Sequence, residues 1–419
     1  MCPLVKDGFT RQDWPEGLKK FITKAHELGL DRNISDHLGK ADLEKDIKIG
    51  MNQKKVKETA SLSLLIHDIC QEKNVTHILD LGCGQGYLSS VLAYQFGYSV
   101  VGWDCDPLQT SGGHQRATRI ADLYNRRGKT ITGSLEFITN TVKIDNDIDA
   151  IFEIVFDQFP QFREKTWLVC GLHCCGNLSP TMINAFCNNK SLPNIAALVN
   201  LGCCYQLLTE KGACDFTDDR GRNSFDTRFG FPMSHCLQDT KLGFNARITA
   251  CQAPKKWGNE AFQKEGEESL RRLYYRSVLE RLIKDYNIHL PVVSDYEAIS
   301  ATQSGERAIK KLGVKDCESP LTYTKAALAR LAAPNSWETL ENASELTDAV
   351  IIATFSWHQS SYDDIASIWA LRCLFSDVIE SLILVDRCIA IRECGLDVDL
   401  VAICDPSDSP RNMAIVVKR

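Results

Sequence analysis

Short apolar segments alternate with longer segments of mixed polarity through the middle of the chain. Between residues 75 and 205, each of the segments THILDLG, YSVVGWD, TITGSLEFI, TWLVCGLH and IAALVNLGCC has the length of one strand. Apolar runs of roughly five to eight residues that alternate with helical segments predict βαβ units and a parallel sheet. Nearly continuous apolar runs such as LVCGL fit strands covered on both faces. We therefore predict an α/β fold with a Rossmann-like, doubly wound sheet.

The pattern differs on either side of this region. WPEGLKKFITKAHEL and VKETASLSLLIHDICQEK predict two N-terminal helices. After the fifth strand the alternation stops for about 140 residues, which include a long helical segment starting at Gln263. The chain then returns to α/β patterning with a long helix, SIWALRCLFSDVIESLILVDRCIAIREC, and two strands, VDLVAICD and NMAIVVKR. Their short link PSDSPR suggests an antiparallel pair.

These patterns predict four regions. We expect an N-terminal helical region (1–70), the first part of a ligand-binding α/β domain (71–205), an inserted helical or irregular subdomain (206–345), and the C-terminal part of the α/β domain (346–419). A chain of 419 residues is long enough for such an arrangement.

The composition excludes several classes of protein. A net charge of -6 argues against a strongly basic nucleic-acid coat protein, although it leaves room for a local basic groove. We find no secretory signal and no apolar run long enough to span a bilayer. The 18 cysteines are scattered rather than spaced as a disulfide scaffold. We therefore expect a cytoplasmic or nuclear protein that is not secreted and does not bind membranes.

A glycine-rich turn follows the first predicted strand, in ILDLGCGQGYLSSVLA. A dinucleotide-binding turn, G-x-G-x-x-G, would place its third glycine where Tyr87 stands. The sequence instead matches the acid–apolar–G-x-G-x-G turn of S-adenosylmethionine (SAM) methyltransferases. An acid at the strand end suits this cationic ligand, whereas it would repel a pyrophosphate. The residues expected at the cofactor are Asp80, Gly82, Gly84, Gln85 and Gly86.

A second acid follows the next predicted strand. Asp104 lies 24 residues after Asp80, an offset typical of a carboxylate that binds ribose hydroxyls, and Asp106 is a nearby alternative. The competing interpretation is a generic glycine turn with solvated acids. The combination of turn, acids and βαβ context favours SAM.

Ligands of doubly wound sheets bind outside the carboxyl ends of the strands, here at GLHCCGNLSP and NLGCCYQL. His173 is a candidate for taking a proton from a nucleophile, or for a structural hydrogen bond. Three roles compete for the pairs Cys174–Cys175 and Cys203–Cys204: zinc ligands, a catalytic thiolate, or small packing residues. Because CC pairs lack the C-x-x-C spacing, we favour packing and predict no metal.

Four further positions are candidates, and Tyr205 joins His173 as a predicted catalytic residue. Asn177 is expected to cap the following helix or to face the substrate. Tyr205 is expected either to stack on or orient the substrate, or to cover the sheet. Lys54 and Lys55 are candidates for binding the carboxylate of SAM or a phosphate, or for a solvated helix start.

Other polar side chains have equally open roles. Lys255, Lys256 and Trp257, with Arg271, Arg272 and Arg276, have the charge and aromatic character of RNA contacts, but the acids between them fit a solvated helix as well. Arg411 and Asn412 in the last turn are expected to flank the site or only to form the turn.

Several segments in order resemble the eukaryotic methyltransferase-like protein 25 family: MNQKKVKE, ILDLGCGQGYLS, VVGWDCD, GLHCCGNLSPTM, NLGCCYQLL, GFPMS, ACQAPKKW and DPSDSPRNMAIVVKR. The resemblance runs from about Ile49 to Arg419 and leaves out the variable middle. It implies a class I methyltransferase fold with an antiparallel last strand and a helical insertion after the fifth strand. The His-Cys-Cys-Gly and CC stretches also look like those of eukaryotic tRNA 2′-O-methyltransferases. His173-Cys-Cys-Gly replaces the Asn-x-x-Phe/Tyr motif of adenine dimethylases, which argues against adenine N6 chemistry.

We therefore predict a SAM-dependent methyltransferase that acts on a macromolecule. The tRNA-enzyme analogy favours RNA, and no DNA partner is expected. The alternatives are a protein methyltransferase, which the acidic net charge favours, and a catalytically silent SAM-binding scaffold. A NAD-dependent oxidoreductase is a more distant alternative. The sequence does not predict the methylated atom or the oligomeric state.

Overall fold

The computed structural model describes most of the chain in two compact units. One unit comprises residues 27–256 and 376–419, and the other comprises residues 1–26 and 257–375. The described residues are 11–34, 42–142, 148–189, 194–210, 230–253, 263–290, 312–332 and 336–419.

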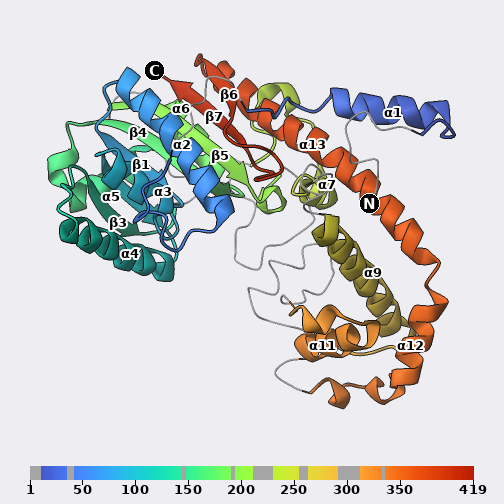
Figure 1. The fold of residues 1–419 in the computed structure, drawn as a ribbon. Coiled ribbons are helices and arrows are strands. Elements are labelled where there is room, and N and C mark those ends of the chain that lie inside the picture. Colours follow the sequence, from blue (N-terminus) through green and yellow to red (C-terminus); the bar gives the residue numbers. More distant parts are fainter. Residues whose placement is uncertain are drawn as a thin grey trace. The chain divides into compact units, whose positions relative to one another are not determined.

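The first unit contains a seven-stranded sheet of order β3-β2-β1-β4-β5-β7-β6 (Figure 1). The first five strands are parallel, and β7 runs antiparallel to both of its neighbours. This topology confirms the predicted doubly wound sheet with an antiparallel last strand. The strands are β1 (His77–Leu81), β2 (Ser99–Asp104), β3 (Ser134–Thr139), β4 (Thr166–Cys175), β5 (Asn194–Cys203), β6 (Val398–Ala402) and β7 (Met413–Lys418).

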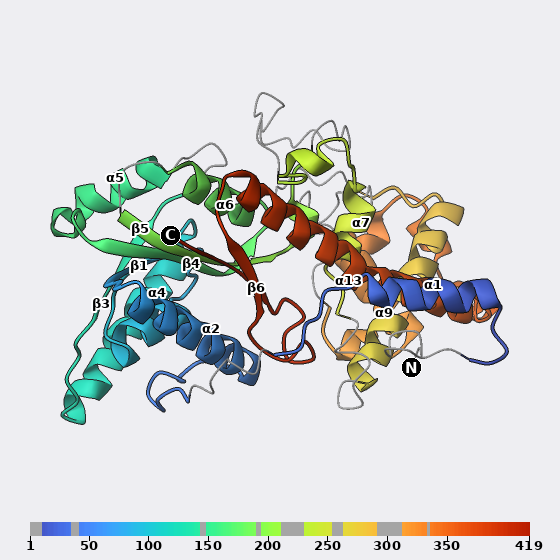
Figure 2. The ribbon, with the colours of Figure 1, turned by 90° about the horizontal axis from the view of Figure 1, so that it is seen from above.

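Helices cover both faces of this sheet (Figure 2). One face carries α2 (Gln53–Glu72), α3 (Tyr87–Ser90, continued by a π-helical turn to Gln95) and α4 (Pro107–Arg126). The other face carries α5 (Ile148–Gln158), α6 (Leu178–Asn188) and the C-terminal part of α13 (Ser361–Glu393). A short helix, α7 (Gly243–Thr249), also belongs to this unit.

The strands are buried on both faces, as their composition predicts. In β1, Ile78 packs with the α2 side, whereas Leu79 and Leu81 pack with the α5 side. This alternation follows from the two-residue period of a strand. It also buries Asp80 between the apolar positions, at 1% exposure.

Side chains at two helix starts explain where those helices begin. Asn52 accepts a hydrogen bond from the backbone N–H of Lys55 over 2.9 Å at the start of α2. Asp106 accepts one from the N–H of Leu108 over 2.8 Å at the start of α4, where Pro107 is the first helical residue. The capped start of α4 therefore follows directly after the end of β2.

The second unit is helical within the described residues. It contains most of α1 (Glu16–Glu27), α9 (Gln263–Asp285), α11 (Pro320–Ala332), α12 (Asp348–Trp357) and the first part of α13. Its core includes Tyr274, Leu279, Leu328 and Phe355. Except for α1, these helices follow β5, as the expected insertion does.

The division into units differs from the expected limits. Residues 206–256 belong to the sheet unit rather than to the insertion, and residues 346–375 belong to the helical unit. The boundary between the two units falls within α13, between residues 375 and 376. Because α13 is one uninterrupted helix, the sequence has no break that marks this boundary. No helix in the described ranges has both the length and the apolar character required to cross a membrane.

Candidate functional site

The glycine turn after β1 has a left-handed backbone at each glycine. The φ angles are 76° at Gly82, 55° at Gly84 and 66° at Gly86, values that favour glycine. A Cβ atom on Gly82 would lie 2.9 Å from Leu178, and one on Gly86 would lie 2.7 Å from Phe137. These two glycines therefore let neighbouring elements pack closely. A Cβ on Gly84 would meet nothing nearer than 3.9 Å, so the backbone there is open to a ligand.

Asp104 binds directly to this turn. Its Oδ2 accepts a hydrogen bond from the N–H of Gly84 over 2.8 Å, and its Oδ1 accepts one from the N–H of Asp106 over 3.0 Å. Each carboxylate oxygen keeps a lone pair for a further donor. Asp106 has a different role, because its own carboxylate caps α4. Of the two acids, Asp104 is therefore the one placed to accept ligand hydroxyl groups.

Asp80 is a buried acid with an incomplete set of partners. Its Oδ2 accepts a hydrogen bond from Ser89 over 2.6 Å, but its Oδ1 has no hydrogen-bond partner among the described residues. Burial, with a smaller effect of the Asp104 charge, raises the pKa of Asp80 to about 6. A buried carboxylate of this kind is stabilised by a nearby cation. The open Gly84 backbone, Asp104 and Asp80 thus fit a ligand that carries ribose hydroxyls and positive charge, as SAM does.

Tyr87, the first residue of α3, contacts two basic side chains and the loop before α2. The Tyr87 ring lies between Lys55, whose Nζ is 4.1 Å from the ring centroid, and Arg116, whose Cζ is 4.4 Å away. The Tyr87 hydroxyl has two acceptors within hydrogen-bond distance, Gln85 Oε1 at 3.0 Å and the Gly50 carbonyl at 3.2 Å. This hydroxyl links the loop before α2 to the glycine turn.

Arg116 strengthens the same link. Its guanidinium donates hydrogen bonds to the carbonyls of Ile47 and Ile49. Sequence analysis did not identify Tyr87 or Arg116. The only signal for Tyr87 is its position directly after the glycines, and no local pattern distinguishes Arg116 from other helical arginines.

His173 lies in a bulge near the end of β4. Gly171 pairs with Asn200 and Cys174 pairs with Gly202, so two residues of β4 stand opposite one of β5. The φ angle of His173 is 64°, which is uncommon for a residue with a side chain. Bulges next to active sites redirect side chains, and this one sets the His173 ring apart from the regular ladder.

The His173 ring meets a buried acid. Its Nε2 lies 3.2 Å from Oε1 of Glu58, which is 2% exposed. Glu58 also accepts a hydrogen bond from Ser409, and its Oε1 lies 3.6 Å from Nζ of Lys54. Burial alone would raise the pKa of Glu58, but the hydrogen bond and charge of His173, with smaller effects of Ser409 and Lys54, lower it. Glu58 is therefore ionised at neutral pH and holds the imidazole in place.

Tyr205 lies inside the protein rather than at the site surface. It is 1% exposed, and its hydroxyl donates to Glu380 over 2.8 Å. Arg387 and Arg411 lie 5.6 and 5.9 Å from its ring centroid. Arg411 also pairs with Glu380, so this predicted substrate-flanking residue is likewise internal. These contacts favour a structural role for Tyr205, and we leave it out of the proposed catalytic set.

Asn177 occupies the N-cap position of α6, but its side chain does not cap the helix. Its Nδ2 donates to Thr209 Oγ1 over 3.0 Å, and its Oδ1 accepts from the N–H of Thr209 over 3.0 Å. Asn177 thus ties the segment after β5 to the end of β4. Asn412 is buried and donates to the carbonyls of Arg32 and Cys404, which fits the turn-forming role expected of it.

The remaining predicted basic group is only partly described. Lys255, Lys256 and Trp257 lie outside the described residues. Arg276, whose side chain is 19% exposed, pairs with Glu280 four residues later on α9.

Three cysteines gather where β4 and β5 end. Sγ of Cys203 lies 3.2 Å from Sγ of Cys175 and 3.7 Å from Sγ of Cys204. Hydrogen bonds from the Cys175 and Cys203 thiols lower the pKa of the Cys204 thiol well below its ordinary value. Cys174, in contrast, is fully buried beside Met182 and fits the packing role expected of it.

Comparison with known proteins finds a methyltransferase domain in this part of the chain. A family described as "Methyltransferase domain" matches residues 54–211, which include Glu58, the glycine turn, Asp104 and His173. The human protein named "Probable methyltransferase-like protein 25" is 23% identical over 484 residues, covering 87% of this chain and 74% of that protein. The mouse protein of the same name is 28% identical over 320 residues. That match covers 74% of this chain but less than half (46%) of the mouse protein.

Among solved structures, a SAM-dependent methyltransferase from Thiobacillus denitrificans with bound S-adenosyl-L-homocysteine is 15% identical. Its TM-score is 0.22, and the match covers 38% of this chain and 55% of that one. A coclaurine N-methyltransferase is 16% identical with a TM-score of 0.21, covering 46% and 52% of the two chains. The fold assignment rests on the strand order. Together, that strand order, the glycine turn with its acids and the matched methyltransferase domain show a class I SAM-dependent methyltransferase whose sequence is similar to the proteins named "Probable methyltransferase-like protein 25".

Proposed function

We propose that this methyltransferase modifies RNA, with His173 as the general base that accepts a proton from the nucleophile. The observation that carries the proposal is the His173–Glu58 pair, held at the β4 bulge on the carboxyl-end side of the sheet where Asp104 also lies. A 2′-hydroxyl is the first acceptor to test. It must lose a proton when it is methylated, and a positioned imidazole can accept that proton.

In this proposal Asp80, Gly84 and Asp104 hold the cofactor. When bound, SAM supplies an activated methyl group and a good leaving group. Asp104 accepts hydrogen bonds from the ribose hydroxyls, and the buried charge of Asp80 favours the cationic part of the ligand. The open backbone at Gly84 lets the ligand approach the turn closely. Gln85 and Tyr87 shape the edge of the turn, and Lys55 is available for the carboxylate of the ligand or for a phosphate.

Glu58 positions and polarises His173. With Nε2 donating to Glu58, the second ring nitrogen of His173 has no hydrogen-bond partner among the described residues and can accept the proton of the nucleophile. The carboxylate then stabilises the imidazolium that forms, as the acid of a catalytic triad does. Because Ser409 and Lys54 also bind Glu58, this carboxylate is held by α2 and by the loop between β6 and β7.

Positive charge near the site favours RNA over a basic protein. Lys54 and Lys55 are exposed at the start of α2, the helix that provides Glu58. Phosphate groups would meet these side chains, whereas a lysine-rich or arginine-rich peptide would be repelled. The resemblance of the His-Cys-Cys-Gly stretch to tRNA 2′-O-methyltransferases points the same way by analogy.

The test is transfer of a radiolabelled methyl group from SAM into an extract of cells that lack the protein. Asp104→Ala and His173→Ala variants serve as controls, and the labelled product is divided between ribonuclease and protease digestion. We expect label that ribonuclease releases. We also expect the rate to fall about 100- to 10,000-fold in His173→Ala, the usual effect of removing a general base.

Other outcomes would contradict specific parts of this proposal. Label that only protease releases would replace the RNA substrate with a protein. Undiminished transfer by His173→Ala would remove His173 from the mechanism. SAM binding without any transfer would favour the silent scaffold.

A further inference from the structure

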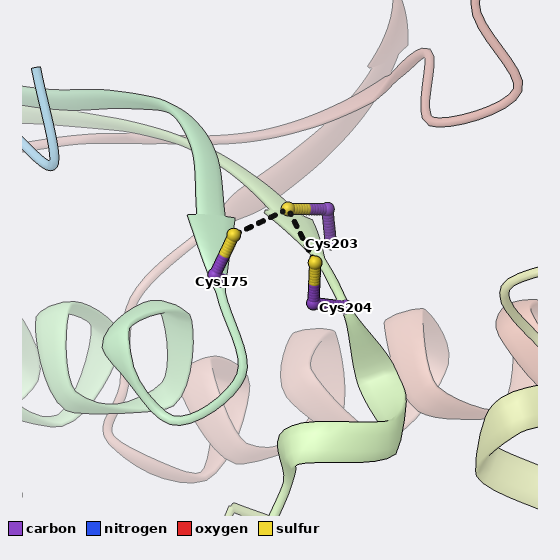
Figure 3. A group of neighbouring side chains, drawn as sticks. All are labelled: Cys175, Cys203 and Cys204. Carbon is purple, nitrogen blue, oxygen red and sulfur yellow. Dashed lines mark hydrogen bonds between the residues drawn. The ribbon is translucent and has the colours of Figure 1, made fainter. Parts of the chain in front are cut away.

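Three thiols converge at the carboxyl ends of β4 and β5, from segments that lie 28 residues apart in sequence (Figure 3). Cys175 is the last residue of β4, Cys203 is the last residue of β5, and Cys204 follows it. The three sulfur atoms all lie within 4.8 Å of one another. We propose that Cys175, Cys203 and Cys204 bind a thiophilic divalent metal ion of the Zn²⁺ type.

The sulfur separations suit a shared ion. A zinc ion binds thiolates at about 2.3 Å, so neighbouring sulfurs of a tetrahedral site lie about 3.8 Å apart. The Cys203–Cys204 separation of 3.7 Å already has this value. The Cys175–Cys203 separation of 3.2 Å is shorter, and a small side-chain rotation would bring it to this value. The strands therefore need no rearrangement to bring the three ligands around one ion.

The backbone at Cys204 makes this convergence possible. Consecutive residues of a strand point to opposite faces, so Cys203 and Cys204 would ordinarily point apart. The φ angle of Cys204 is 51°, in the left-handed region that side chains rarely adopt. This turn directs both sulfur atoms to the same side. The sequence spacing therefore gave no indication of a metal site, because CC pairs become ligand pairs only through this backbone conformation.

A buried arginine balances the charge of such a site. Three thiolates around a divalent ion leave one net negative charge. Arg387 is 0% exposed, and none of its guanidinium nitrogens has a hydrogen-bond partner among the described residues. Its Nη1 fills the space where a Cβ on Gly202 would lie, and its charge interacts with Tyr205, Asp386, Cys174 and Cys203, in decreasing order. A buried cation without hydrogen bonds is costly, and an anionic metal–thiolate group beside it would offset that cost.

The proposed site has three protein ligands, so the fourth coordination position of a tetrahedral metal ion stays open. Among the described residues, no further His, Cys, Asp or Glu side chain joins it. Three ligands with one exchangeable position are typical of zinc sites that bind water or a ligand atom, rather than of closed structural sites. Cys175 is exposed, so the fourth position is reachable from solvent. On metal binding, each thiol that is still protonated releases its proton to solvent.

Cobalt titration of the full chain tests the proposal. The reduced protein is stripped of metal with a chelator and titrated with Co²⁺, and Zn²⁺ is then added. We expect one equivalent of Co²⁺ to produce thiolate-to-cobalt charge-transfer absorption, and Zn²⁺ to remove it. Because the readout is metal binding itself, failure of this test leaves the proposed methyl transfer untouched.

Two exposed cysteines provide a matched pair of variants. Cys175→Ser removes one ligand, and Cys236→Ser removes an exposed thiol elsewhere in the same unit. We expect Cys175→Ser to weaken Co²⁺ binding at least about 100-fold, the upper end of the effect of losing a second-shell partner, and Cys236→Ser to leave it unchanged. Circular dichroism of both variants checks that they fold.

Three results would overturn the metal site. The first is the absence of charge-transfer absorption in the parent protein, and the second is equal Co²⁺ affinities in the two variants. The third is a disulfide between Cys175 and Cys203 after mild oxidation, in a chain whose reduced form takes up no Co²⁺. The latter result would assign the three thiols to thiol–disulfide chemistry instead.

Discussion

The Tyr205 hydroxyl donates a hydrogen bond to Oε1 of Glu380 over 2.8 Å, although 175 residues separate the two along the chain. The Glu380 carboxylate is 1% exposed and also pairs with Arg411 and, over 3.0 Å, with Arg32. This buried group joins the segment after β5 to α13, the last turn and the segment after α1. Tyr205 therefore contributes to the framework of the sheet unit.

We predict that Tyr205→Phe destabilises the protein without removing its function. The ring still packs, but Glu380 loses one donor, so the free energy of unfolding should fall by about 1–3 kcal/mol. Urea denaturation measures this loss, and SAM affinity measured at a temperature where the variant is folded should stay within about twofold. A variant with parent stability but no methyl transfer would instead return Tyr205 to the catalytic set.

Variants of Asp104 and Asp106 should affect different properties, namely SAM affinity for Asp104 and the stability of α4 for Asp106. Asp104→Asn loses one acceptor for the backbone N–H groups and the charge offered to the ribose hydroxyls. We expect SAM affinity, measured by calorimetry, to fall about 100-fold, from about 1.5 kcal/mol for each of two hydroxyl contacts.

The matched variant is Asp106→Ala, which removes only the cap of α4. It should lower the free energy of unfolding by about 1 kcal/mol and leave SAM affinity nearly unchanged. The reverse order of effects would make Asp106 the ribose ligand.

SAM affinity should depend on pH through Asp80. Burial raises the pKa of this acid to about 6 in the ligand-free protein, and a cation stabilises only its ionised form. Affinity should therefore be greatest above about pH 6 and fall as the pH decreases through that value, by up to about tenfold per pH unit. The ligand ammonium does not reverse this trend, because an α-amino group stays protonated below about pH 7.

Calorimetry at about pH 5 and about pH 7.5 measures this dependence. Asp80→Asn should flatten it, since the amide does not titrate, whereas Asp106→Ala should retain it. An unchanged pH dependence in Asp80→Asn would exclude Asp80 as its source.

The same raised pKa means that ionised Asp80 costs the ligand-free protein about 3 kcal/mol at neutral pH. This cost is absent below the unfolded pKa, develops as the pH rises from that value to about 6, and is nearly constant above it.

Glu58→Gln should identify Glu58 as a positioning residue for His173. The amide keeps an oxygen that can accept from Nε2 but no longer stabilises the imidazolium. We expect kcat to fall about tenfold or more with little change in SAM affinity. A purely structural role would lower stability and leave kcat of the folded enzyme unchanged.

The sequence determined the features that depend on local pattern and short spacing. The βαβ periodicity predicted the sheet, the glycine turn predicted a close approach of the backbone to a ligand, and the strand-to-strand offset favoured Asp104, with Asp106 as the alternative. These features lie within single elements or at successive strand ends, where hydrophobic period and residue spacing carry the information.

Only the tertiary structure decided which distant side chains meet. Glu58 pairs with His173 of β4 and accepts a hydrogen bond from Ser409, which lies 351 residues away in a loop. The buried Tyr205 donates a hydrogen bond to Glu380. The left-handed backbone at His173 and Cys204 likewise has no signature in the residue types. Such conformations persist because the surrounding packing holds them, and packing between elements far apart in the chain cannot be read from the local pattern of one sequence.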